Sequence, residues 1–371
     1  MKENPDGDGL AQARAEIDRI NDELVRLFVR RLDLSSKIAS AKRAAGKPVT
    51  DPQREREILS RVGASVPPEY ESAARLLFST LFSVSKARQR ELMRAADAEV
   101  PPKWRVAVVG MGLIGGSFEK AAAKAGYAVR ALHHGDATGF EDADLILVCL
   151  PPDAVVPWVE AHCGGFRKGA TVVDIAGVKT SVMEGMGRVP RDGWTFVGGH
   201  PMAGREVTGY ENSLADLFVG ASMILVPEAG DRAAEGGVMS RLEAFFRSVG
   251  FERVVVTTAA EHDEMIAFTS QLCHAMATAY ARDGLVPGTP GFSAGSFADM
   301  TRIATQDPAI WTELFLANRG PLLSVVDRFA SRIGEFRSAL EACDRDAVSR
   351  MISEGAEAKR RLNLAADFWY N

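Results

Sequence analysis

The chain is 371 residues long, and at roughly 150 residues per domain this length predicts two to three domains. Its composition is that of a globular protein, with 46% hydrophobic and 25% charged residues, and its formal net charge of −5 argues against a nucleic-acid-binding protein. The amino terminus lacks a signal-peptide hydrophobic region, and no hydrophobic run reaches the roughly 18 residues that span a bilayer, so we expect a cytoplasmic protein with no membrane partner.

The distribution of charge and of cysteine narrows the possibilities further. Residues 1–97 contain 18 Lys and Arg against 15 Asp and Glu, a net charge of +3, so the remaining residues carry −8. The four cysteines have no C-x-x-C or metal-ligand spacing, and we therefore expect buried, reduced thiols and no bound metal. They are Cys149, Cys163, Cys273 and Cys343.

The first hundred residues are predicted to form three helices. Hydrophobic residues recur at helical spacing from Leu10 to about Ala45, and two shorter helices are expected over about 52–62 and 68–96. The first helix would be about 54 Å long at 1.5 Å per residue, which exceeds the diameter of a small domain. Much of it must therefore pack against another surface, and we expect a second copy of the chain.

The region after Pro101-Pro102 changes from helical to alternating patterns. Short hydrophobic runs alternate with helical stretches, which favours a parallel α/β sheet, and from about residue 260 the chain is helical again. The expected strands lie at about 104–109, 127–132, 144–150, 171–175, 195–197, 222–226 and 254–257.

A glycine-rich loop lies between the first strand and the following helix. Residues 110–116 contain G-x-G-x-x-G in the context that a dinucleotide-binding loop requires. The first glycine makes a tight turn, the second lets a pyrophosphate approach, and the third allows close packing of helix on strand. The expected cofactor-binding residues here are Gly110, Gly112, Leu113, Ile114 and Gly115. The predicted fold is thus multidomain: an all-α region (1–97), a linker (98–103), an α/β Rossmann-type domain (104–258) and an all-α region (259–371).

The residues after the second strand leave the choice of cofactor open. No carboxylate follows the strand directly, although Asp136 could hold the ribose hydroxyls from slightly further on. His133, His134 and the nearby Arg130 would instead suit a 2′-phosphate. NAD is favoured, and NADP is the alternative.

A second polar group of residues follows a later strand. His200, in Gly199-His200-Pro201, is placed to accept a proton from a hydroxyl that is being oxidised. His262 and His274 follow, and then Arg302. Alone, His274 reads as a core histidine and Arg302 as a surface or ion-pair residue, but together the four indicate an oxidoreductase with an anionic substrate.

Residues 104–371 resemble prephenate dehydrogenase through the segments G-x-G-L-I-G-G-S, V-K, G-H-P-M-A-G, E-H-D and R-x-x-x-Q-D-P. The resemblance implies that His200 polarises the ring hydroxyl of prephenate while a hydride passes to the nicotinamide, and that loss of carbon dioxide aromatises the ring. It assigns Arg302 to a substrate carboxylate, and His262 and His274 to the substrate site. The family often has serine where this chain has Gly177, so Thr180, Ser181 or a water must substitute.

The helical region carries its own ordered set of polar residues. Arg31 and Lys42 are 11 residues apart, about 20° from eclipsed, so they share one face. Arg14 lies about 25 Å before Arg31 and could serve a partner's pocket in a dimer. Asp51 also reads as an ordinary helix N-cap. The complete set is Arg14, Arg31, Lys42, Asp51, Arg54, Glu55, Ser85 and Gln89.

This set is similar, in order and spacing, to the all-helical chorismate mutases. The resemblance assigns Arg31, Ser85 and the partner's Arg14 to the substrate carboxylates, Lys42 and Gln89 to the ether oxygen, Asp51 and Glu55 to the ring hydroxyl, and Arg54 to the supporting network. Such a site binds a dianion in a compact conformer and stabilises the charge that develops on the ether oxygen.

We therefore expect a homodimeric bifunctional enzyme of tyrosine biosynthesis that acts on chorismate and prephenate. Two alternatives remain: an arogenate dehydrogenase with the same fold, and a helical region that is only a dimerisation or regulatory module.

Overall fold

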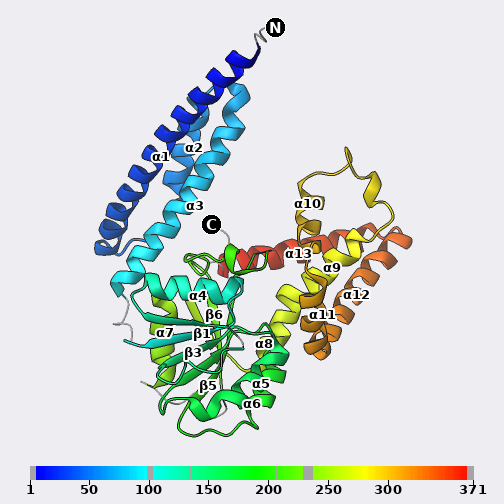
Figure 1. Ribbon diagram of the computed structural model, residues 1–371. Helices are drawn as coiled ribbons and strands as arrows, with labels where there is room; N and C mark the ends of the chain where they lie inside the picture. Colours follow the sequence, from blue (N-terminus) through cyan, green and yellow to red (C-terminus); the bar gives the residue numbers. More distant parts are fainter. Residues whose placement is uncertain (1–5, 98–102, 134, 206, 229–236, 366–371) are drawn as a thin grey trace, which may run out of the picture. The chain divides into compact units, whose positions relative to one another are not determined.

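The computed structural model describes residues 6–97, 103–133, 135–205, 207–228 and 237–365. The chain divides into two compact units, residues 1–99 and 100–371 (Figure 1). Within the described ranges, no helix is both long enough and apolar enough to cross a bilayer.

The first unit consists of three helices. Asp51 caps the second one, because its Oδ1 accepts a hydrogen bond of 3.0 Å from Arg54 N, and Pro52 occupies the first helical position. The third helix packs against both of the others. The three predicted helices are confirmed as α1 (Asp6–Ala44), α2 (Pro52–Ala64) and α3 (Glu71–Asp97), with a 3-10 turn (Pro68–Tyr70) before α3.

Helix α1 exposes much of its hydrophobic surface in the single chain. Ile17, Leu24 and Leu27 keep 56%, 53% and 61% of their surface accessible. Exposed hydrophobic patches of this extent mark interaction surfaces. The long helix therefore has a face suited to a second protein surface, as its length predicted.

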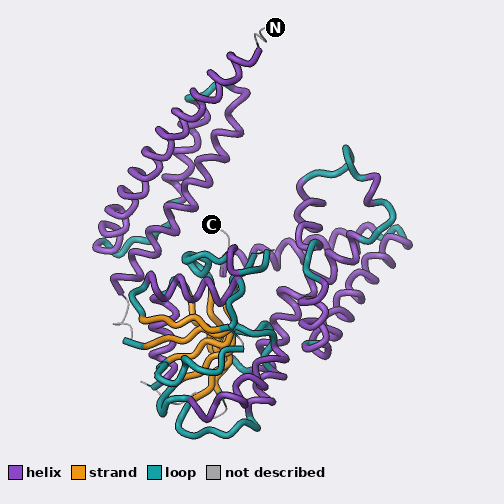
Figure 2. Tube along the Cα trace, viewed as in Figure 1, coloured by secondary structure: helices purple, strands orange, loops and turns teal. Residues whose placement is uncertain are grey.

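The second unit is built around a seven-stranded sheet in the order β2-β1-β3-β4-β5-β6-β7 (orange in Figure 2). The strands are β1 (Arg105–Val109), β2 (Ala128–Leu132), β3 (Leu145–Val148), β4 (Thr171–Asp174), β5 (Thr195–Pro201), β6 (Ser222–Pro227) and β7 (Arg253–Val256). All seven coincide with the predicted runs. The strand order reverses between β1 and β3, and ligands of such sheets bind at that point, beyond the carboxyl ends of the strands.

Helices cover both faces of the sheet. One hydrophobic cluster joins the sheet to α4 (Leu113–Lys124) and α7 (Val238–Ser248), and Phe118 stacks there on Phe218 with centroids 4.2 Å apart. A second cluster joins the other face to α5 (Pro152–His162) and α6 (Thr180–Met186). The doubly wound arrangement predicted from the alternating pattern is thereby confirmed.

The direction of β6 departs from the expected parallel sheet. β6 runs antiparallel to β5, whereas every other neighbouring pair is parallel. The described chain between β5 and β6 forms only a short 3-10 turn, Tyr210–Asn212, and contains no α-helix of the kind that usually makes a parallel crossover. Hydrophobic runs alone do not specify strand direction, which is why the sequence pattern missed this reversal.

The carboxy-terminal part of this unit is helical, as expected. Its helices are α8 (Ala259–Ile266), α9 (Leu272–Ala281), α10 (Gly295–Thr301), α11 (Pro308–Ala317), α12 (Arg319–Glu341) and α13 (Arg345–Ala365). A π-helical turn, Ala267–Gln271, joins α8 to α9, and α8 packs against α6 at the edge of the sheet. One expectation fails in this region: Cys273 and Cys343 are exposed and the other two cysteines are half-buried. Cys273 lies on the surface of α9 and Cys343 in the turn between α12 and α13, both outside the hydrophobic cores.

Candidate active site

The glycine loop has the geometry of a dinucleotide-binding turn. Gly110 has φ +91°, and a Cβ there would lie 2.4 Å from Cys149 O. A Cβ on Gly115 would lie 1.9 Å from Gly110 O, so the loop and the start of α4 touch backbone to backbone. A Cβ on Gly112, in contrast, would meet nothing within 4 Å. The first and third glycines are therefore required by packing, and the second faces open space where a phosphate fits.

The amino end of α4 supplies the donors for such a phosphate. Gly112 is the N-cap of α4 and offers no side chain to its N–H groups. Gly116 N donates to Gly112 O at 2.9 Å, so the helix itself makes no use of the N–H groups of Leu113, Ile114 and Gly115. Those three groups and the positive end of the helix dipole suit a diphosphate.

Asp136 lies in the turn after β2, the strand whose last residue contacts the glycine loop. Its Oδ2 accepts a hydrogen bond of 2.7 Å from His133 N. Gly110 N donates to Leu132 O at 2.9 Å, which joins the end of β2 to the loop. His134, considered for a 2′-phosphate, lies outside the described residues, and Arg130 is exposed.

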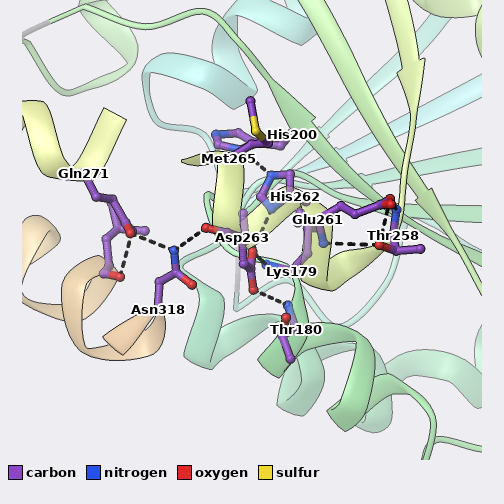
Figure 3. A network of polar contacts seen from close by, with 12 residues as sticks. Lys179, Thr180, His200, Thr258, Glu261, His262, Asp263, Met265, Gln271 and Asn318 are labelled. Carbon is purple, nitrogen blue, oxygen red and sulfur yellow. Dashed lines mark hydrogen bonds and ion pairs between the residues drawn. The ribbon is translucent and has the colours of Figure 1, made fainter. Parts of the chain in front are cut away.

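His200 heads a chain of hydrogen bonds that ends on a carboxylate. It stands near the end of β5, and its Nδ1 lies 2.8 Å from His262 Nε2 (Figure 3). His262 Nδ1 lies in turn 2.7 Å from Asp263 Oδ1. His262 and Asp263 are buried, at 2% and 1% exposure, whereas His200 is half-buried. We call His200, His262 and Asp263 the histidine relay.

Backbone donors hold Asp263 in place. Lys179 N donates to Oδ1 and Thr180 N to Oδ2, both at 2.8 Å. Burial by itself raises the pKa of Asp263, but hydrogen bonds from His262, Thr180 and Lys179 outweigh it, so the pKa lies below its usual value. Asn318 also donates to the main-chain oxygen of Asp263 at 2.9 Å, which connects α12 to the relay. The carboxylate is therefore ionised and fixed.

An ionised Asp263 determines which ring nitrogens carry protons. It accepts from His262 Nδ1, which leaves His262 Nε2 as the acceptor for His200 Nδ1–H. Burial lowers the pKa of His262, and burial followed by the charges of His262 and Lys179 lowers that of His200 well below 6.5. Both rings are neutral near pH 7. On this hydrogen-bond assignment, His200 Nε2 is an unprotonated acceptor.

A buried ion pair contacts the backbone next to the relay. Lys179 Nζ and Asp174 Oδ2 form a hydrogen-bonded ion pair, with no side-chain surface exposed on either residue. Asp174 also accepts from Gly199 N at 3.3 Å and from Ala176 N at 3.0 Å. The pair thus connects the end of β4 to the strand that carries His200. No role was predicted for Lys179 or Asp174 from the sequence.

The space beside His200 Nε2 is bordered by Gly177. A Cβ on Gly177 would lie 3.9 Å from His200 Nε2 but 3.1 Å from Leu314 Cδ2, so Leu314 limits the room for a side chain. The expectation that Thr180 or Ser181 takes the place of a serine here is wrong. The Thr180 hydroxyl bonds to Asp263, and Ser181 is exposed on α6.

The remaining residues predicted for this site differ in placement. His262 was expected in the substrate site, and the structure places it behind His200, with both of its ring nitrogens engaged within the relay. His274 packs on Trp311 with ring centroids 3.6 Å apart. Arg302 is exposed on a 3-10 turn between α10 and α11. Neither His274 nor Arg302 belongs to the relay. Asp263 was missed, although the E-H-D segment places it directly after His262.

The helical unit gathers part of its predicted set. Arg31 donates to Ser85 Oγ and, at 2.8 Å, to Leu81 O, which joins α1 to α3. Burial lowers the pKa of Arg31 below its usual value. Lys42 donates to Val49 O. Ser85 and Gln89 are buried one turn apart on α3, at 5% and 7% exposure.

Other members of the set lie at the surface of this copy. Arg14 is exposed on α1. Asp51 serves as the cap of α2, and Arg54 pairs with Glu57 at 3.0 Å with 58% of its side chain exposed. The predicted supporting role of Arg54 is therefore not seen, because its guanidinium is engaged along its own helix.

Three family models match successive parts of the chain: chorismate mutase type II over residues 13–90, the nucleotide-binding domain of prephenate dehydrogenase over 106–248, and its dimerization domain over 258–354. The cyclohexadienyl dehydrogenase of Zymomonas mobilis is 30% identical over 292 residues, which cover 71% of this chain and 97% of that protein. The T-protein of Enterobacter agglomerans is 25% identical, with 95% of each chain covered. The chain belongs to the bifunctional chorismate mutase–prephenate dehydrogenase family.

Solved structures show the same fold for the dehydrogenase part. The arogenate dehydrogenase of Synechocystis covers 70% of this chain and is itself covered to 99%, with a TM-score of 0.60 and 20% identity. Prephenate dehydrogenase of Aquifex aeolicus, in complex with hydroxyphenyl propionate and NAD+, gives 0.57 and 24%, with 72% and 100% covered. The two activities are those of a chorismate mutase and a nicotinamide-dinucleotide-dependent prephenate dehydrogenase.

Replacing Asp263 tests the relay directly. Asp263→Asn removes the anion, so His262 no longer holds its proton on Nδ1 and His200 Nε2 loses its acceptor state. We expect kcat for prephenate oxidation to fall by about a thousandfold, as when an aspartate that orients a catalytic histidine is neutralised. Steady-state rates measure this effect. Mutase activity of the same preparation is the control for folding, and a near-normal kcat would show that the relay is not used.

The low pKa of His200 predicts the acidic limb of the dehydrogenase. The neutral ring is the active form, so kcat/KM for prephenate should be unchanged at pH 6.5 and fall only well below it. Below pH 6.5 the unfolded chain binds a proton that folded His200 refuses, so this residue also lowers stability there and has no such effect above. Rate profiles from pH 5 to 8, roughly the window in which histidine titrates, test this expectation. An acidic limb centred at or above 6.5 would contradict it.

Proposed function

We propose that His200 is the proton acceptor of the dehydrogenase. The observation that carries this proposal is the relay, which leaves His200 Nε2 as a neutral acceptor next to Gly177. The bound nicotinamide supplies the hydride acceptor. As the hydride leaves the ring carbon, the hydroxyl proton passes to His200 Nε2. The bond to the ring carboxylate then breaks, carbon dioxide leaves, and the electron pair of that bond completes the aromatic ring. The ring oxygen takes the proton back from His200, which gives 4-hydroxyphenylpyruvate and restores the neutral histidine.

We infer that NAD is preferred over NADP. The Asp136 side chain lies in the turn after β2 and is oriented by His133 N at 2.7 Å. A carboxylate at this position accepts hydrogen bonds from ribose hydroxyls and repels a 2′-phosphate. The diphosphate is assigned to the amino end of α4, at Gly110, Gly112 and Gly115.

We propose that the substrate carboxylates of chorismate are bound by Arg31 with Ser85, and by Arg14 of the partner subunit. Lys42 and Gln89 are assigned to the ether oxygen. Among the described residues, Gln89 Oε1 is buried without a hydrogen-bond partner, so no hydrogen bond holds the amide against a rotation that presents Nε2, the donor that an ether oxygen requires. Asp51 and Glu55 are assigned to the ring hydroxyl. In the dehydrogenase, Arg302 is assigned to a carboxylate and His274 to the wall of the substrate site.

We propose a homodimer that uses both units. The exposed hydrophobic face of α1 supports one interface. In the second unit the matched family model is itself a dimerization domain, and hydrophobic side chains such as Leu316 and Leu340 are 61% and 64% exposed there. We also propose domain boundaries at 1–97, 104–258 and 259–371.

Two substitutions separate the activities. Arg31→Ala removes the buried contact to Ser85 and a carboxylate partner, so mutase kcat/KM should fall by more than about a hundredfold while most dehydrogenase activity remains. His200→Asn should do the reverse. Rates with chorismate and with prephenate, measured separately, test both variants. A wild-type chain that leaves chorismate unconsumed would mean that the helical unit is only an interaction module.

Cofactor choice is tested by a coupled assay of chorismate with NAD or NADP. The wild type should use NAD more efficiently. Asp136→Asn keeps an acceptor for His133 N but removes the charge, so the preference for NAD should fall by about tenfold, in keeping with the loss of one charged hydrogen bond. An unchanged ratio of the two kcat/KM values would exclude Asp136 from this role. Arogenate supplied in place of prephenate tests the substrate, and a strong preference for it would identify an arogenate dehydrogenase.

A further inference from the structure

Lys86 is a buried lysine in the helical unit to which the sequence pattern gave no role. It lies on α3 directly after Ser85 and one turn before Gln89, with 6% of its surface exposed. Its ammonium lies 3.3 Å and 3.4 Å from the two carboxylate oxygens of Glu55 on α2. Glu55 itself keeps 27% of its side chain exposed.

Helix packing alone does not account for a lysine at this position. Removing an ammonium from water costs several kcal/mol, and a hydrophobic side chain of similar volume usually stabilises such a site at least as well. The ammonium has three donors, and its hydrogen-bond or ion-pair partner among the described residues is Glu55. The ammonium therefore has donor capacity beyond that one carboxylate. It lies on the same stretch of α3 as Ser85 and Gln89.

Charge complementarity with the substrate indicates why a lysine is buried at this position. Among the buried and half-buried side chains that are assigned to this site, Arg31 and Lys42 are positive and Glu55 is negative, so these charges sum to +1 without Lys86 and to +2 with it. Chorismate carries two carboxylates. Without Lys86, the carboxylate of Glu55 would stand uncompensated in a pocket that must bind a dianion, and like charges in such a pocket oppose binding.

We propose that Lys86 is a positioning residue of the mutase site. It holds the Glu55 carboxylate oriented for the ring hydroxyl and offsets its charge, so that a dianionic substrate can enter beside it. The proposal rests on the assignment of Glu55 to the substrate. It adds a binding determinant on α3 between the two residues of that helix that were expected to contact chorismate.

The test uses the full chain with Lys86→Met, which keeps the length of the side chain and removes its charge. The KM for chorismate should rise about tenfold, because an electrostatic contribution to binding is lost, while kcat changes less. Lys86→Arg should restore KM to within about twofold of the wild type, because the charge is retained. The matched control is Lys37→Met, which changes an exposed lysine on α1 and should leave both constants unchanged.

A purely structural role would give a different result. Partial unfolding of the helical unit reduces the number of active sites, so apparent kcat would fall at unchanged KM and Lys86→Arg would show no specific rescue. That pattern, or a KM in Lys86→Met within twofold of the wild type, would overturn the proposal. Thermal unfolding and dehydrogenase rates of the same preparations report folding. If Lys86→Met does not fold, Lys86→Gln replaces it with the same expected rise in KM.

A double-mutant cycle distinguishes this proposal from the assignment on which it rests. Lys86 acts through Glu55, so Glu55→Gln combined with Lys86→Met should change kcat/KM by less than the product of the two single effects. Independent effects would contradict the coupling. If Glu55→Gln alone leaves kcat and KM as in the wild type, the assignment of Glu55 has failed. If Glu55→Gln impairs the mutase but Lys86→Met does not, only the role of Lys86 has failed.

Discussion

The dehydrogenase site depends on one buried carboxylate. Asp263 lies on α8 in the helical part, yet its two oxygens accept from the backbone of Lys179 and Thr180, where β4 leads into α6. The same carboxylate fixes the tautomer of His262 and, through it, the acceptor state of His200 on β5. Three separate segments are thus joined through one anion: its donors come from the β4–α6 connection and from His262 on its own helix, and His262 in turn contacts His200 on β5.

The buried ion pair of Asp174 and Lys179 also helps to position the relay. The ion pair of Asp174 and Lys179 has no exposed side-chain surface, and such pairs rarely stabilise a fold more than hydrophobic residues would. The pair contributes by positioning the backbone beside His200 and by placing a positive charge near that residue. Asp174 accepts from Gly199 N beside His200, and the charge of Lys179 contributes to the low pKa of His200. A neutral histidine near pH 7 is what a proton acceptor requires.

The parts of this structure that depend on local pattern were predictable from the sequence. The seven strands, the three amino-terminal helices and the glycine loop follow from periodicity and from glycines at fixed spacing. The relay was only partly predictable, because His200 and His262 are 62 residues apart and meet only when α8 packs on α6. The direction of β6 depends on how a loop closes. Lys86 reads as a surface residue in the sequence, since a single lysine in a helix carries no mark of burial.

The two units treat the same dianion differently, because prephenate is the product of one and the substrate of the other. The mutase has no proton to move, so half-buried and buried cations can stay fixed and charged at its pocket, the role that we propose for Arg31 and Lys86. The dehydrogenase must keep a neutral base beside the reacting hydroxyl. An unpaired buried cation next to His200 would act on the charges that develop during every step of the reaction. Its buried lysine is therefore neutralised by Asp174, and the arginine assigned to the substrate carboxylate is kept at the surface.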